Sequence, residues 1–314
     1  MQLSSSFQSH GWEIKYSLQG QPESINVRKP TVVFVHGTPW SSGVFQPIAK
    51  ALLSRGQYQV LLYDLPGYGQ SQSSLKSDPA GQQSGQFAGD TSVKTQGAVL
   101  ADLLNHLQLD GKDGRRAPAI VAHDIAGAIA FRTHLIHQCD FSSLLMMDTN
   151  TVLPWGDGFY KLARSKAEVF QELPHGIYAA MVRAVIQSAC RNPKVLASGW
   201  EDALARAWVA DDNEDSTAAS EKQSSFVRQI AQANDADVAE MLDADMYKQV
   251  RCDVKIVWGE QDQWIPRHKM DSLAKMLGQR LKEFVVVPEA GHLVMLDQPE
   301  RVSVEIFDWL SKYT

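Results

Sequence analysis

Short runs of apolar residues recur along the chain, and helical patterns separate them. Six runs are apolar without polar alternation: residues 31–35, 60–63, 119–122, 143–147, 254–258 and 284–287. Continuous hydrophobicity is typical of strands buried on both faces of a parallel sheet. Between the runs, leucines fall at helical spacing, as in 100–107, and a further helical pattern covers 129–137. The alternation predicts an α/β fold with a mostly parallel, doubly wound sheet.

The strand pattern stops after residues 143–147 and resumes only at Val254. Helical patterns fill the interval, over 158–172, 176–189 and 224–233. We therefore expect one α/β core with an inserted helical lid. The predicted division is 1–151 for the first part of the core, 152–247 for the lid and 248–314 for the rest of the core. Two polar stretches, 70–95 and 211–222, are predicted to be exposed loops.

Composition excludes several classes of protein. The net charge of −6 is spread along 314 residues, so no basic surface is expected for nucleic acid or a membrane, and we expect a small organic molecule as the partner. No stretch of about 18 apolar residues is present. Three widely spaced cysteines and no apolar leader predict reduced thiols in a cytoplasmic protein. Neither a metal-ligand cluster nor a nucleotide fingerprint calls for a cofactor, and the sequence does not reveal the oligomeric state.

The strongest local signal is an apolar strand that turns into a helix at Ala122-His123-Asp124-Ile125-Ala126-Gly127. In the nucleophile elbow, G-x-S-x-G, the reactive residue sits on a strained turn with small neighbours, because strand and helix crowd it. Here Asp124 takes the place of the serine, and Gly127 lies one position beyond the second glycine. On this segment alone, a helix N-cap is an alternative role for Asp124.

Three further signals follow in chain order. His36-Gly37-Thr38-Pro39 comes after the first strong strand, where backbone N–H groups can supply half of an oxyanion hole. Asp262, in Gly259-Glu260-Gln261-Asp262, comes after the strand at 254–258, and His292 comes after the last strand. In α/β-hydrolases the nucleophile, the acid and the histidine follow one another along the chain in this order. Asp148, after the strand at 143–147, is a second and weaker candidate for the acid.

The whole chain resembles the α/β-hydrolase superfamily, and in particular the branch of haloalkane dehalogenases and epoxide hydrolases. The elbow is similar to their G-H-D-x-G-G. Residues 36–42, HGTPWSS, are similar to H-G-x-P-x-S-S of dehalogenases, and 258–262, WGEQD, to the acid-bearing W-G-x-x-D. The resemblance implies an α/β-hydrolase fold without a cofactor. It also implies a nucleophilic Asp124, a basic His292 and an orienting Asp262.

An aspartate changes the reactions within reach. A carboxylate is ionised at neutral pH without help from a base, so it can attack a saturated carbon and form an alkyl ester. His292 then activates the water that hydrolyses this ester. The backbone N–H groups of Thr38 and Ile125 are expected to hold the oxyanion.

The leaving group separates the two branches. Dehalogenases usually hold the halide with a Trp after the nucleophile and with an Asn, but this chain has Ile125 and Thr38 there. Lid tryptophans are possible replacements: Trp155, Trp200 and Trp208. Epoxide hydrolases protonate the opening oxygen with lid tyrosines, and the candidates are Tyr160, Tyr178 and Tyr247.

The sequence therefore predicts a hydrolase that forms an alkyl-enzyme ester on Asp124, with epoxide opening slightly preferred. A haloalkane dehalogenase with an atypical halide site is the first alternative. A cofactor-free lyase or cyclase with Asp124 as a base, and a small-molecule receptor on the same fold, also stay open.

Overall fold

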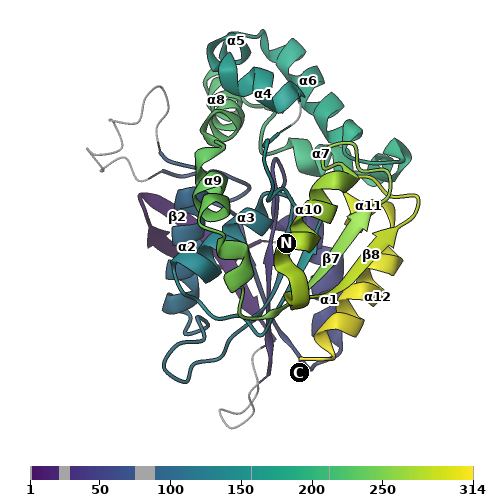
Figure 1. The fold of residues 1–314 in the computed structure, drawn as a ribbon. Helices are drawn as coiled ribbons and strands as arrows, with labels where there is room; N and C mark the ends of the chain where they lie inside the picture. The colour runs from purple at the N-terminus through teal and green to yellow at the C-terminus, as the bar shows by residue number, and fades with distance from the viewer. Residues whose placement is uncertain (1, 21–28, 75–88, 157, 212, 314) are drawn as a thin grey trace.

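The computed structural model describes residues 2–20, 29–74, 89–156, 158–211 and 213–313. Its centre is an eight-stranded sheet in the order β1-β2-β4-β3-β5-β6-β7-β8, shown in Figure 1. The strands β3 to β8 run parallel to one another. Strand β2 runs antiparallel to both of its neighbours, β1 and β4. The strands are β1 (Ser5–Ser9), β2 (Trp12–Gln19), β3 (Thr31–Val35), β4 (Gln59–Tyr63), β5 (Ala119–His123), β6 (Ser143–Met147), β7 (Asp253–Gly259) and β8 (Leu281–Val287).

All six predicted strands are confirmed within a few residues at their ends. Every residue of β3, β5 and β6 is buried, as expected for strands covered on both faces. The N-terminal hairpin β1–β2 was not predicted. Its strands join at His10 and Gly11, both with positive φ (49° and 76°), which suits a two-residue hairpin turn.

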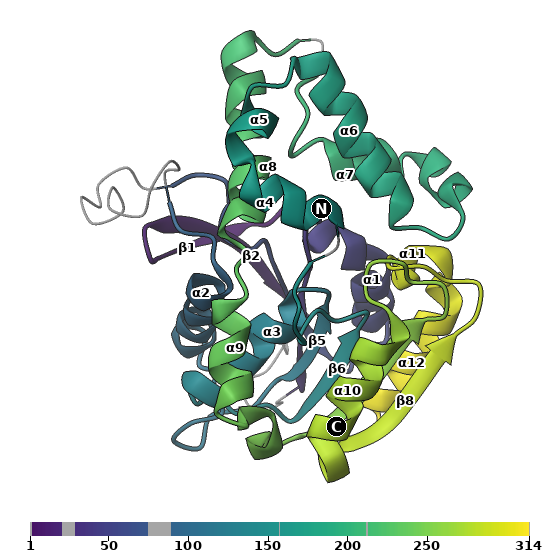
Figure 2. The same cartoon turned by 45° about the horizontal axis from the view of Figure 1, so that its top comes forward.

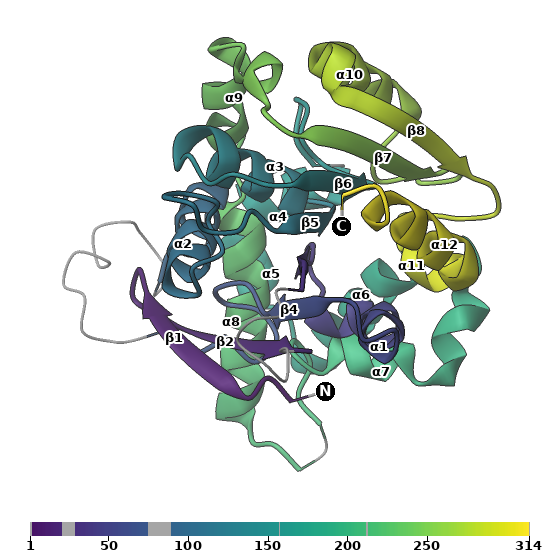
Figure 3. The ribbon, with the colours of Figure 1, turned by 90° about the horizontal axis from the view of Figure 1, so that it is seen from below.

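Helices cover both faces of the sheet. Figure 3 shows α1 (Gln46–Ser54) and α12 (Pro299–Leu310) on one face, and α2 (Val93–His106), α3 (Ala126–Phe131) and α10 (Arg267–Leu277) on the other. A π turn at Arg132–Ile136 extends α3, and the short α11 (Val294–Asp297) precedes α12. The doubly wound α/β architecture predicted from the sequence is confirmed.

Between β6 and β7, all the secondary structure of the described residues is helical. Figure 2 shows α4 to α8 gathered beyond one edge of the sheet, whereas α9 runs down beside the core. There Arg132 of the core donates to the carbonyl of Asp237 in α9 and pairs with Glu240. The helices are α4 (Gly158–Ser165), α5 (Ala167–Gln171), α6 (His175–Ser188), α7 (Trp200–Ala205), α8 (Ser216–Gln232) and α9 (Ala236–Asp243), with short 3-10 turns at Pro193–Ser198 and Met246–Gln249.

The two predicted loops need correction. Residues 93–95 belong to α2, which Ser92 caps by accepting the N–H of Thr95, and residues 75–88 lie outside the described residues. Residues 216–222 belong to α8 rather than to an exposed connection. Asp215 caps this helix, because its Oδ1 accepts the N–H groups of Thr217 and Ala218. In both places the helix begins directly after a capping side chain, several residues before the apolar pattern begins.

Candidate active site

Asp124 occupies a sharp turn between β5 and α3. Its φ of 57° is left-handed, a conformation that Asp tolerates better than most side chains. Its N–H donates to Met147 O at 3.1 Å, and its carbonyl accepts from Gly127 N (3.1 Å), Asn150 N (3.0 Å) and Thr149 Oγ1 (3.1 Å). The Asp124 side chain does not cap α3, whose N-cap residue is Ile125. The geometry is that of the elbow rather than of a helix cap.

Two glycines allow the backbone to approach this turn. A Cβ on Gly37 would lie 2.5 Å from Asp124 Cβ, and one on Gly127 would lie 1.6 Å from Thr149 Oγ1. Position 127 therefore needs a glycine, because the loop after β6 passes directly over it.

The Asp124 carboxylate lies in a cradle of backbone donors. Thr38 N–H donates to Oδ2 at 2.9 Å, and the N–H of Ile125 also reaches the carboxylate. Asp124 is 3% exposed. Burial raises its pKa to about 6, and the opposing effects of His292, Thr38 and Ile125 are smaller. Both N–H donors predicted for an oxyanion hole thus meet at the predicted nucleophile.

His292 and Asp262 meet at the other side of Asp124. Nδ1 of His292 lies 3.0 Å from Asp262 Oδ2, and Nε2 lies 3.8 Å from Asp124 Oδ1. The second oxygen of Asp262 accepts the N–H groups of Trp264 (2.7 Å) and Ile265 (3.0 Å), which fixes the carboxylate. The three predicted residues therefore form one contiguous triad at the carboxyl ends of β5, β7 and β8.

Trp264 was not predicted, and it joins several parts of the site. Its ring stacks on His292, with centroids 4.7 Å apart and planes at 24°, and on Trp40 at 5.8 Å. Its indole N–H donates to Ser188 Oγ at the end of α6, at 3.2 Å. One side chain therefore contacts the base of the triad and the lid together.

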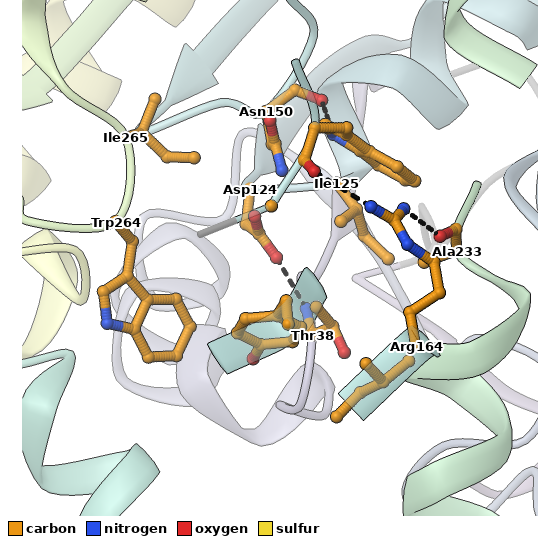
Figure 4. A pocket seen from close by; sticks show the side chains of 12 residues that line it. Thr38, Asp124, Ile125, Asn150, Arg164, Ala233, Trp264 and Ile265 are labelled. Carbon is orange, nitrogen blue, oxygen red and sulfur yellow. Dashed lines mark hydrogen bonds between the residues drawn. The ribbon is translucent and has the colours of Figure 1, made fainter. Parts of the chain in front are cut away.

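A pocket opens beside Asp124, as Figure 4 shows. It encloses a cavity of about 40 Å³, which is room for a small group only. Figure 4 shows the Asn150 amide directed to the same side of the pocket as the Asp124 carboxylate. The lining residues come from the strand ends and the lid: Thr38, Asp124, Ile125, Asn150, Trp155, Gly156, Tyr160, Arg164, Ile230, Ala233, Trp264 and Ile265.

Of the predicted lid tyrosines, Tyr160 on α4 lines this pocket. Tyr178 does not: it packs edge to face against Phe226, between α6 and α8. Tyr247 donates its hydroxyl to Thr151 O at 2.8 Å and also lies outside the lining. Sequence spacing places a residue on a helix but does not say what that face contacts.

Two of the three lid tryptophans donate their indole N–H groups to backbone carbonyls. Trp155 lines the pocket, but its indole N–H donates to Asn150 O at 2.9 Å. Trp208 donates to Pro39 O at 2.7 Å, and neither Trp208 nor Trp200 is a lining residue. Trp155 and Trp208 are therefore structural donors in this conformation.

Arg164 was also missed by the sequence reasoning. Its guanidinium donates to the carbonyls of Ala233 and Trp155 and pairs with Asp235 at 3.2 Å. These contacts tie α4 to the end of α8. Because its N–H groups are taken by two carbonyls and by Asp235, Arg164 fits a lid anchor better than a carboxylate-binding group.

His36 and His123 have backbone partners. His36 Nε2 accepts the N–H of Leu65 at 3.0 Å, and His123 Nε2 lies 2.8 Å from His292 O. Burial is the main cause that lowers the pKa of each. Both are neutral histidines that hold loops.

The structure also bears on other classes of site. Within the described ranges, no three His, Cys, Asp or Glu side chains converge to hold a metal ion. Cys139, Cys190 and Cys252 are buried and unpaired, as predicted for thiols in the core. None of the helices in the described part of the chain is long and apolar enough to cross a bilayer.

Comparison with known proteins agrees with the fold. The model of the family described as "Alpha/beta hydrolase family" matches residues 32–305. The chain belongs to the α/β-hydrolase family.

Solved structures of similar fold cover the chain nearly end to end. The crystal structure of an alpha/beta hydrolase fold protein from Burkholderia ambifaria is 28% identical, covers 98% of each chain and has a TM-score of 0.80. A thermophilic esterase from Thermogutta terrifontis, determined with malate bound, is 22% identical, covers 99% of this chain and 100% of its own, and has a TM-score of 0.70. No curated protein matches the chain in sequence.

Proposed function

We propose that this α/β-hydrolase hydrolyses a small epoxide through an ester on Asp124. The proposal rests on the different surroundings of the two oxygens of the Asp124 carboxylate. Oδ2 accepts the N–H of Thr38 at 2.9 Å, and Oδ1 lies 3.8 Å from His292 Nε2. Oδ1 is therefore the attacking oxygen, and Oδ2 becomes the ester carbonyl, already placed where an oxyanion would be stabilised.

In the first step Oδ1 attacks an epoxide carbon, the carbon–oxygen bond of the ring breaks, and the departing oxygen takes a proton. Tyr160 is the donor we assign, because its hydroxyl belongs to a pocket-lining side chain. In the second step His292 takes a proton from water, which attacks the ester carbonyl. Collapse of the oxyanion releases a diol and the Asp124 carboxylate, and the proton on His292 restores Tyr160.

The pocket supports an epoxide over a haloalkane. A halide needs N–H donors, but Ile125 has an aliphatic side chain, and Trp155 and Trp208 donate to backbone carbonyls. A carboxylic ester is a poorer substrate for an aspartate, because attack at its carbonyl would give a reactive anhydride rather than an alkyl ester. Tyr160 instead offers an O–H that can give its proton to a departing oxygen, whereas the N–H groups of Asn150 suit either leaving group.

Trapping the ester tests the proposal. In His292→Gln the new amide can still donate to Asp262, but it is no base, so the ester on Asp124 should accumulate. The variant is incubated with small epoxides and haloalkanes, and the intact protein is weighed. We expect an added mass equal to a whole epoxide, located on Asp124 by peptide mapping and absent from the His292→Gln/Asp124→Asn double variant.

Other outcomes identify other functions. An added alkyl group without its halide would establish dehalogenation instead. If the parent enzyme turns over a panel member that leaves no adduct on the variant, covalent catalysis by Asp124 is wrong. The cofactor-free lyase or cyclase, with Asp124 as a base, then becomes the better account.

A further inference from the structure

Asp148 is a fully buried acid that the proposed chemistry does not use. It directly follows β6, with a left-handed φ of 43°. Its N–H donates to Val257 O at 3.1 Å, and its Oδ1 accepts the N–H of Gly259 at 2.8 Å. Both bonds join the ends of β6 and β7, so the carboxyl group is fixed beneath the loop that carries Asp262.

Oδ2 of Asp148 is buried, and no hydrogen-bond donor of the described residues reaches it. The neighbouring acid is Asp262, whose side chain lies close enough to raise the pKa of Asp148. Two carboxylates repel each other, so a hydrogen bond between them needs a proton on one. Asp262 accepts two backbone N–H groups and faces His292 Nδ1, whereas the Asp148 side chain accepts the N–H of Gly259. Three donors stabilise the charge of Asp262 and one that of Asp148, so the proton belongs on Asp148.

Burial points the same way. It is the largest cause that raises the pKa of Asp148 well above its usual range, and the charges of Asp262 and Asp124 add to it. The hydrogen bond from Gly259 opposes these effects without reversing them.

We propose that Asp148 is a neutral acid that donates its O–H to Asp262 and thereby positions the carboxylate that orients His292. The Asp262 carboxylate then makes four hydrogen bonds, which fix it and, through it, the orientation of His292. Asp148 is a positioning residue rather than an alternative partner for the base. The inference rests on the proposed function only where activity is the readout.

Two substitutions separate this role from that of an ionised acid. Asp148→Asn keeps the size, the acceptor for Gly259 and a donor for Asp262, so kcat should fall by less than about threefold. Asp148→Ala leaves Asp262 without that donor, and kcat should fall about 10-fold or more. The comparison is Asp262→Asn, which removes the charge beside His292 and should cost about 10⁴-fold.

Infrared spectroscopy tests the proton directly, without a substrate. At about pH 8 Asp124 is ionised, so the carbonyl stretch of a neutral carboxylic acid should come from Asp148 and shift in D₂O. We expect this band in the parent protein and not in Asp148→Asn. The matched control is Asp64→Asn, which alters a buried acid whose oxygens accept the N–H groups of Ser42 and Gln70 and should leave the band in place.

The proposal is wrong if the parent lacks the band, if Asp148→Asn retains it, or if Asp148→Asn is as inactive as Asp262→Asn. Failure of the proposed function is distinguishable, because a missing ester in His292→Gln would leave the infrared band unchanged. If Asp148→Ala fails to fold, the Asn variant and the spectrum still decide the question.

Discussion

The strand ends and the lid build the pocket in different ways. Thr38, Asp124 and Asp262 are each held by hydrogen bonds that involve the backbone of the loops after β3, β5 and β7. The lid wall instead depends on helix packing and on the contacts of Arg164. The outer surface of the lid also exposes Leu162, Val169 and Ile177. The residues at the strand ends are thus fixed by hydrogen bonds, whereas the lid residues that line the pocket, Tyr160 among them, are positioned by helix packing.

The largest expected effect lies at the strand ends. Asp124→Asn removes the nucleophilic charge, and activity should fall by about 10⁴-fold or more. The fold should persist, because Asn also tolerates a left-handed φ and can accept the Thr38 N–H. Steady-state kinetics and thermal unfolding measure the two quantities. Activity near that of the parent would remove Asp124 from the mechanism.

A substitution in the lid tests whether this segment takes part in the chemistry. Tyr160→Phe removes the proposed proton donor and should lower kcat for an epoxide by about 10²-fold, the usual size of general acid catalysis. Tyr178→Phe is the matched control, because that residue lies outside the pocket lining, and its activity should stay close to that of the parent. Equal effects of the two variants would show that the lid contributes packing rather than chemistry.

The rigidity of the elbow is testable as stability. Gly127→Ala places a Cβ against Thr149 Oγ1 and should destabilise the protein by about 1–3 kcal/mol. Gly158→Ala is the control, since a Cβ there meets nothing within 4 Å. Urea unfolding measures both, and the Gly127→Ala/Thr149→Ala double variant should recover part of the loss. If the urea midpoint of Gly127→Ala equals that of the parent, the loop after β6 can move away from residue 127 at little cost in free energy.

At neutral pH the smallest effect comes from the pKa of Asp124, and it appears as a pH dependence in acid. The raised pKa of Asp124, about 6, means that this nucleophile becomes protonated at a higher pH than an ordinary aspartate. The protonated form does not attack, so kcat/KM should fall as pH decreases through about 6, tenfold per unit below it. A pH–rate profile measures this dependence. A flat profile down to about pH 4 would contradict the burial argument.

Much of the fold was predictable because a buried parallel strand is apolar throughout, as at Val32 to Val35. The hairpin β1–β2 was missed although Trp12, Ile14 and Tyr16 are buried on one face, an alternation with Glu13 and Lys15 that is visible in the sequence. Its half-polar pattern is that of an antiparallel edge, which a search for continuous apolar runs overlooks.

The triad was predictable for a related reason. Asp124 directly follows β5, and Asp262 and His292 lie three and five residues beyond the ends of β7 and β8. Parallel strands bring their carboxyl ends to one edge of the sheet. Asn150 and Trp264 lie two residues beyond Asp148 and Asp262, where the path of the loop decides what a side chain contacts. The choice of Tyr160 over Tyr178 depends on how α4 and α6 pack, which spacing along one helix does not encode.

Single-turnover isotope labelling tests the ester on Asp124 most directly. Excess enzyme is mixed with a small epoxide in water enriched in heavy oxygen, and the diol is weighed after one turnover. Attack by Asp124 predicts that the first diol carries ordinary oxygen from the carboxylate and that the label appears on Asp124. Label in the first diol with an unlabelled Asp124 would mean that water attacks the epoxide directly, and the account would be wrong.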